Sequence, residues 1–142
     1  MIAETLGIDG VTGSYFTDVS SEDPFAASIN GLAAAGLIKG MGDGTFQSEK
    51  LMTRQEYCVL LERVLCGLNL NYLHAGAGIT PEELQGTEAM GFHTWAQESA
   101  AILEMADALY FSDAEADPTG AILREEAAAI LCAVLRGAGV LN

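Results

Sequence analysis

The sequence predicts an all-α protein built from a helix-loop-helix unit that occurs twice. Ala and Leu are abundant whereas β-branched residues are few, which favours helices over strands. The same interval of 29 residues separates Phe25 from Arg54 and Trp95 from Arg124, and each arginine opens an Arg-x-Glu sequence. Internal similarity at a fixed spacing is typical of one supersecondary unit used more than once, and such repeats usually build binding or scaffolding surfaces.

Composition narrows the class of protein. A chain of 142 residues is long enough for a single domain, over 1–142, in which two repeats share a core. Hydrophobic residues make up 50% and charged residues 18%, so we expect a folded chain. The formal net charge of −14, with six basic residues, disfavours nucleic acid and anionic membrane surfaces as partners. The sequence shows neither an apolar run of about 18 residues nor a signal peptide, so we expect no membrane insertion.

Residues 1–7 read as the last turns of an amphipathic helix that Gly7 closes. They resemble the ends of two later helices, at 64–67 and 134–137. We therefore expect residues 1–15 to be the tail of a preceding repeat followed by a linker.

The first copy, at 16–67, opens with Asp23 as N-cap and Pro24 in the first turn of a helix that stops at Gly36. Phe25 is expected on the apolar face of this helix, in the protein core. A loop rich in glycine follows over 39–51, and Phe46 is expected to pack onto the core from it.

The second helix of this copy begins with a capping box at 53–56. Thr53 should accept the amide hydrogen of Glu56, whose carboxylate reaches back to the amide of Thr53. Its apolar stripe comprises Tyr57, Leu60, Leu61, Val64 and Leu65.

The segment 68–94 is predicted as a linker with one helical turn at 81–84.

The second copy, at 95–142, is degenerate. Thr94 should cap a helix that begins at Trp95, which we expect in the core, and a final helix should run from about Leu123 to Arg136. Leu123 replaces the capping threonine, at a cost of about 1 kcal/mol. Its apolar residues are Ile130, Leu131, Val134 and Leu135, the equivalents of the earlier stripe, and an offset of 70 also carries Asp43 to Asp113.

No catalytic centre or metal site stands out. Cys58 and Cys66 lie about 12 Å apart along one predicted helix, too far for a disulfide, and with Cys132 are expected to be buried thiols. An acidic stretch at 113–117 followed by Glu126 resembles a calcium loop, but its glycine and last acid are displaced, which favours a solvated loop. We expect no enzyme activity, no cofactor and no metal.

Five short motifs, in order and with the right gaps, resemble an S-layer homology repeat. They are Phe16-Thr-Asp-Val19, Phe25-Ala26, Leu32-Ala-Ala-Ala-Gly-Leu-Ile-Lys-Gly40, Asp43-Gly-Thr-Phe46 and Thr53-Arg-Gln-Glu56. The resemblance is clear over about 16–67 and fainter over about 95–137. It implies helix-loop-helix repeats packed as a pseudo-symmetric helical bundle.

The resemblance also implies a function. Such repeats attach exported bacterial proteins to cell-wall polysaccharide, often pyruvylated, so the protein would lie outside the cell, in the wall or S-layer, as part of a secreted parent. Further repeats of that parent or a second copy of the chain are the other expected partners. The alternative is a protein-interaction or self-assembly scaffold derived from the repeat, without carbohydrate binding.

By the same resemblance Arg54 is the main candidate for pairing with a ligand carboxylate, which its planar donors can bind in bidentate fashion. Asp18, Gly40 and Ser48 fall at groove-lining positions, and Arg124 is the equivalent of Arg54 in the second copy. The competing interpretation pairs each arginine with an internal carboxylate. A last set is expected to serve structure: Thr53, Glu56, Glu126, Asp43 and Trp95. For Trp95 and Phe25 the alternative to a place in the core is a platform for a sugar ring.

Overall fold

The computed structural model describes residues 2–5, 7–8, 13–67, 78–109, 111 and 117–137. The chain divides into two compact units, Met1–Lys50 and Leu51–Asn142. The boundary lies inside the predicted first repeat, so the two helices of that repeat belong to different units. That 1–142 forms a single domain stays a prediction.

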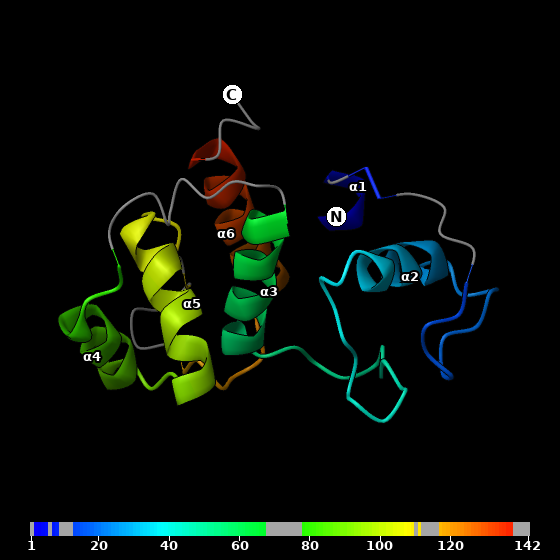
Figure 1. Cartoon of the computed structure of the whole chain (residues 1–142), viewed down its shortest axis with the longest axis horizontal. Helices are drawn as coiled ribbons and strands as arrows, with labels where there is room; N and C mark the ends of the chain where they lie inside the picture. Colours follow the sequence, from blue (N-terminus) through cyan, green and yellow to red (C-terminus); the bar gives the residue numbers. More distant parts are fainter. Residues whose placement is uncertain are drawn as a thin grey trace. The chain divides into compact units, whose positions relative to one another are not determined.

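The first unit contains α1 (Ile2–Thr5) and α2 (Ala26–Ala34), which pack together (Figure 1). Ile8, which follows α1, approaches α2 closely at Gly31, because a Cβ there would lie 2.7 Å from Cγ2 and 3.2 Å from the carbonyl oxygen of Ile8. Gly7 follows α1 with φ +62°, as expected for a residue that closes a helix. The helical interpretation of 2–5 is confirmed, and its origin in a preceding repeat stays a prediction.

Helix α2 begins at Ala26, later than predicted. The carboxylate of Asp23 accepts the amide hydrogen of Phe25 at 2.8 Å and so forms a turn before the helix instead of capping it. The N-cap is Phe25. The predicted stop is confirmed, because Gly36 has φ +73° just beyond the helix.

The core of the first unit is formed by Phe16, Val19, Ala26 and Ile29, with Phe46 packed against it. The rings of Phe16 and Phe46 have centroids 5.3 Å apart, so the loop is fixed to the core as predicted. Gly40 makes this possible. It has φ +63°, and a Cβ there would lie 2.4 Å from the carbonyl oxygen of Thr45 and 2.5 Å from the ring of Phe16.

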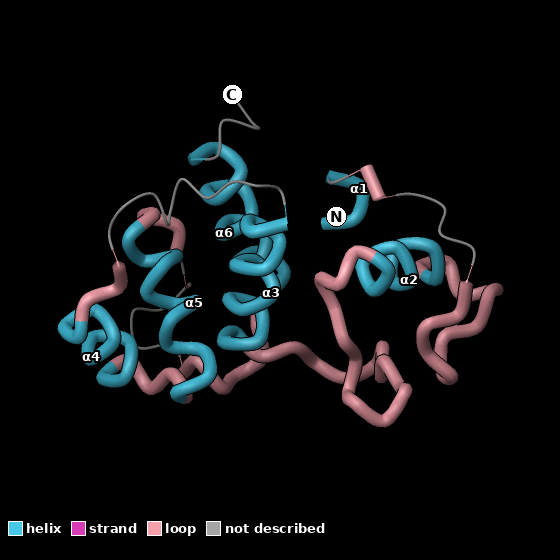
Figure 2. Tube along the Cα trace, viewed as in Figure 1, coloured by secondary structure: helices cyan, strands magenta, loops and turns pink. Residues whose placement is uncertain are grey.

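The second unit contains α3 (Arg54–Gly67), α4 (Pro81–Ala89), α5 (Thr94–Met105) and α6 (Arg124–Gly137). Helix α5 packs against both α3 and α4 (Figure 1). Among the described residues the architecture is helical, joined by loops (Figure 2), with an isolated antiparallel bridge between Thr53 and Ala121. None of the described helices is long and apolar enough to cross a membrane.

Helices α3 and α6 confirm the internal equivalence, because each has 14 residues and starts at the arginine of an Arg-x-Glu sequence. The equivalent apolar residues are buried in both: Leu60, Leu61, Val64 and Leu65 in α3, and Ile130, Leu131, Val134 and Leu135 in α6. Cys58 is a buried free thiol as predicted, whereas Cys132 is only partly buried and the Cys66 side chain lies outside the description.

The predicted linker contains more structure than one turn. Helix α4 has nine residues and its own capping box, in which Thr80 accepts from the amide of Glu83 and Glu83 accepts from the amide of Thr80. The sequence Thr80-Pro-Glu-Glu83 carries this signal. A helix that packs on α5 belongs to the second unit, so 81–89 is not a linker.

The expectation that Phe25 and Trp95 lie in the core is wrong, since they are 68% and 56% exposed. In each copy the next residue, Ala26 or Ala96, is buried instead. Successive helical residues are rotated by about 100°, so the position before a buried one points elsewhere. The cap of α5 was also predicted wrongly, because His93 rather than Thr94 is the N-cap and no side chain bonds there.

We predict that Gly40→Ala lowers the free energy of unfolding by about 2–4 kcal/mol, since it combines a left-handed conformation with overlap against the backbone of Thr45. Gly42→Ala is the matched control, because Gly42 has φ +88° with nothing within 4 Å of the added Cβ. It should cost about 1–2 kcal/mol. Urea unfolding followed by far-UV circular dichroism measures both, and equal losses would contradict the steric argument.

Candidate functional site

The predicted capping box at the start of α3 is present. The amide of Glu56 donates to Oγ1 of Thr53 at 3.2 Å, and the amide of Thr53 donates to Oε2 of Glu56 at 2.8 Å. The start of α3 also bonds to the loop that precedes α6, because the amide of Arg54 donates to the carbonyl oxygen of Gly120 at 3.0 Å. The backbone at Arg54 is therefore held from both sides.

The guanidinium of Arg54 binds the carboxylate of Glu126. Nε lies 3.2 and 3.1 Å from Oε1 and Oε2, and Nη2 lies 3.1 Å from each oxygen. The two side chains are 12% and 1% exposed, so the pair is buried. Nη1 donates to the carbonyl oxygen of Asp117 at 3.2 Å, and the guanidinium carbon lies 5.6 Å from the ring centroid of Phe111. Arg54 thus has the internal pairing that was the competing interpretation.

Glu126 serves two helices at once. Its Oε2 accepts the amide hydrogen of Leu123 at 2.9 Å, which is the reach-back half of a capping box for α6. Leu123 has no hydroxyl, so the other half is missing, as the sequence predicts. The cap role predicted for Glu126 is confirmed, and the same carboxylate also fixes Arg54.

Asp18 braces the loop of the first unit. Its two oxygens accept the amide hydrogens of Phe46 and Gln47, each at 2.8 Å. These backbone hydrogen bonds hold the pKa of Asp18 below its usual value, with the bond from Phe46 the largest cause. The side chain proposed as a groove residue is therefore also a structural one.

Asp43 closes the tip of the same loop. Its Oδ1 accepts from the amide of Thr45 at 2.9 Å and from the hydroxyl of Thr45 at 2.6 Å. The bond from the hydroxyl is the main cause that lowers the pKa of Asp43. This is the structural role that the motif predicts.

The structure places the remaining predicted site residues in different surroundings. Ser48 is exposed and lies in the same loop as Gly40, next to the backbone that Asp18 holds. Arg124 is exposed at the start of α6. Gly40 and Ser48 therefore lie in the loop of the first unit that Asp18 braces, whereas Arg54 and Arg124 begin two helices of the second.

The second copy has a loop turn that the fixed offset missed. Asp117, not Asp113, accepts from the amide of Thr119, and both of its oxygens accept from the hydroxyl, all at 2.8 Å. This Asp-x-Thr turn matches that of Asp43, and Asp113 lies outside the described residues. The signal was present in the sequence, but it requires a loop four residues shorter, because Asp43 precedes Arg54 by 11 positions and Asp117 precedes Arg124 by 7.

Gln55 and His93 form a second contact that sequence reasoning missed. Oε1 of Gln55 accepts the amide hydrogen of His93 at 3.1 Å, and Nε2 of Gln55 lies 3.3 Å from Nδ1 of the imidazole. Gln55 is 4% exposed. This contact joins the start of α3 to the start of α5, and no local pattern predicts it.

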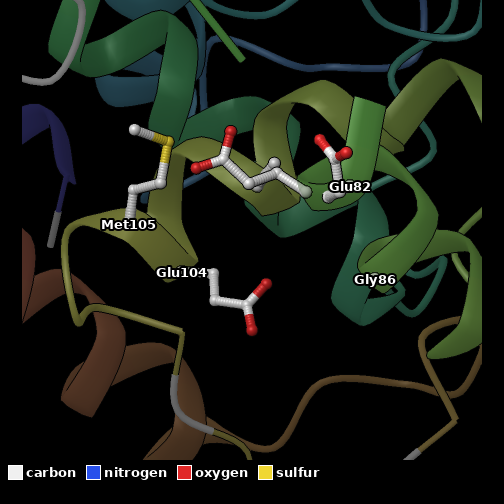
Figure 3. Close-up of a pocket in the computed structure, with 6 residues that line it drawn as sticks. Glu82, Gly86, Glu104 and Met105 are labelled. Atoms are coloured by element: carbon white, nitrogen blue, oxygen red, sulfur yellow. The ribbon is translucent and has the colours of Figure 1, made fainter. Parts of the chain in front are cut away.

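A hollow of about 390 Å³ lies between α4 and α5. Glu82 and Gly86 come from α4, and Glu104 and Met105 come from α5 (Figure 3). None of the predicted ligand residues lines it, and its carboxylates, with that of Glu83, disfavour an anionic sugar. The hollow is not the predicted groove.

Residues 15–58 match the family model of the S-layer homology domain. The match confirms the predicted resemblance over most of the first copy, and it includes neither 59–67 nor 95–137. Proteins with this domain occur at the cell surface or in S-layers, and the domain itself is a non-catalytic anchoring domain that generally binds cell-wall polymers. Comparisons with curated proteins and with solved structures each gave no match. The match supports a cell-surface anchoring module in general.

We predict that Arg54→Ala costs about 3–5 kcal/mol of unfolding free energy, because it leaves the buried carboxylate of Glu126 without its cation. Arg124→Ala is the matched control, at the equivalent helix position but exposed, and should cost less than about 0.5 kcal/mol. Urea unfolding at neutral pH gives both values. Similar costs for the two variants would show that the buried pair contributes no more than a surface charge.

We also predict that acid weakens the loop of the first unit through Asp18. Because the folded pKa lies below the unfolded value near 3.8, the contribution is full above that value and is lost as pH falls through the folded pKa. Asp18→Asn should therefore lower stability at neutral pH and flatten its decline below about pH 4. Urea midpoints between pH 7 and pH 2 test this against Glu49→Gln, a change at an exposed acid of the same loop. Parallel curves for Asp18→Asn and the parent would contradict it.

Proposed function

We propose that the chain is a non-catalytic module that anchors an exported bacterial protein to cell-wall polysaccharide. The observation that supports this most strongly is the S-layer homology match over residues 15–58. The loop within that segment keeps the internal hydrogen bonds of Asp18 and Asp43 that hold its shape. A preformed loop binds a ligand without the entropic cost of ordering it.

In this proposal Arg54 contributes less to the ligand than the motif suggests. The edge formed by Nε and Nη2 is occupied by Glu126, and the side chain is 12% exposed. A ligand carboxylate, such as that of a pyruvyl group, would meet only the remaining Nη hydrogens. Among the predicted ligand-binding residues, Asp18, Ser48 and Arg124 are exposed, and the oxygens of Asp18 already accept backbone hydrogen bonds.

The alternative, a protein-interaction or self-assembly scaffold, is favoured by one apolar surface of the second unit. Leu51, Met52 and Leu123 are 75%, 39% and 46% exposed. They lie near one another, because the amide of Ile122 donates to the carbonyl oxygen of Met52 at 3.0 Å. Exposed apolar side chains gathered in this way are common at protein contacts.

Sedimentation with purified bacterial cell walls tests the proposal. We expect the chain to pellet with intact walls and to stay in solution with walls whose polysaccharide has been removed by hydrofluoric acid. Equal pelleting with both preparations would contradict polysaccharide recognition. Failure to pellet with either, together with self-association in analytical ultracentrifugation, would favour the scaffold.

A further inference from the structure

The two copies share an exposed aromatic residue that the fold does not need for its core. Phe25 and Trp95 occupy equivalent positions and are 68% and 56% exposed, whereas Ala26 and Ala96 are buried beside them. An exposed indole in one copy and an exposed phenyl ring in the other contribute little to packing. Single exposed apolar side chains are common on protein surfaces, so the polar groups around such a residue decide whether it marks a contact site.

The surroundings of Trp95 are ordered by buried residues. The imidazole of His93 meets the indole edge to face, with ring centroids 6.3 Å apart and an interplanar angle of 71°. His93 is held in turn by the buried side chain of Gln55, through its amide and through Nδ1. The imidazole is therefore held beside the indole before any ligand arrives.

The hydrogen bonds of Gln55 determine which nitrogen of His93 is a donor. Oε1 of Gln55 accepts the hydrogen of the backbone amide of His93. The side-chain Nε2 of Gln55, which can only donate, therefore faces Nδ1 of the His93 imidazole. Nδ1 must then accept, and the neutral imidazole carries its proton on Nε2. His93 offers one N–H donor at the side of Trp95.

Asp117 supplies an acceptor in the same region. Its carbonyl oxygen binds Nη1 of Arg54 at 3.2 Å, and its carboxylate is held by Thr119. The hydroxyl of Thr119 is the main cause that lowers the pKa of Asp117, and the charge of Arg54 lowers it further. The carboxylate is therefore ionised near neutral pH. The next residue, Pro118, accepts the amide hydrogen of Gln55 at 2.9 Å, so Asp117 lies beside the residue that holds His93.

We propose that Trp95, His93 and Asp117 form a stacking site for a neutral pyranose unit of the wall polymer, an inference that rests on the proposed function. The apolar C–H face of a pyranose ring is attracted to the electron-rich face of an indole. The imidazole N–H and the carboxylate are a donor and an acceptor for its hydroxyl groups. The charge of Asp117, in a chain of net charge −14, disfavours a sugar acid at this position.

The site gives the buried residues of the Thr53-Arg-Gln-Glu56 segment a positioning role. Gln55 fixes His93, and Arg54 fixes the backbone of Asp117. Neither side chain needs to touch the ligand to affect its binding.

Trp95 is the sole tryptophan of the chain, so its fluorescence reports on this site directly. The probe is the soluble polysaccharide that hydrofluoric acid releases from purified walls. We expect a saturable change in emission of the parent chain, and a loss of affinity of at least about tenfold in wall sedimentation for Trp95→Ala. Trp95→Phe, which keeps an aromatic face, should bind within about threefold of the parent.

Met90→Ala is the matched control, because Met90 is 40% exposed in the same unit. It should bind walls as the parent does, and circular dichroism should show unchanged melting for every variant compared. If the parent pellets with walls and Trp95→Ala pellets equally well, the stacking site is wrong while the anchoring function stands. If the parent does not pellet, the anchoring function itself fails and this site falls with it.

Discussion

The carboxylate of Glu126 joins the two helices on which the second unit is built. It is 1% exposed, it binds the guanidinium of Arg54 with both oxygens, and it accepts the amide hydrogen of Leu123 at the start of α6. A carboxylate removed from water is costly unless donors replace the water. Each donor is therefore needed, and the starts of α3 and α6 are held together by one group. The boundary at Lys50 puts α3 in this unit, so the Arg-x-Glu helix of the family-matched segment depends on residues of the second copy.

This arrangement changes what the arginine of the motif can do. A guanidinium that satisfies an internal carboxylate on one edge and a backbone carbonyl on the other has few donors left for a ligand. The exposed groups of the proposed stacking site are instead an indole, an imidazole and a carboxylate, which are suited to hydroxyl groups and an apolar ring face. In this proposal the buried motif residues Gln55 and Arg54 set the positions of His93 and Asp117, and the exposed side chains contact the ligand.

Local patterns predicted the parts of the fold that local physics controls. The capping box of Thr53 and Glu56, the apolar stripes of α3 and α6, and the packing of Phe46 all follow from residue type and spacing. The errors share a different cause. An ungapped offset aligned Asp43 with Asp113, although the second loop is shorter and uses Asp117. Aromatic character suggested burial for Phe25 and Trp95, although the helix phase places their alanine neighbours inside. The contacts of Arg54 with Glu126 and of Gln55 with His93 join positions 72 and 38 residues apart, which no local window reports.

A double-mutant cycle between Arg54 and Glu126 tests the central claim most directly. The variants Arg54→Met and Glu126→Gln, alone and together, keep side-chain volume while removing one charge, the other, or both. If the buried pair joins α3 and α6, the double variant should be more stable than the sum of the single losses predicts, with a coupling free energy of at least about 2 kcal/mol. Single losses that add within about 0.5 kcal/mol would show that the two side chains are energetically independent, and the account of the second unit would be wrong.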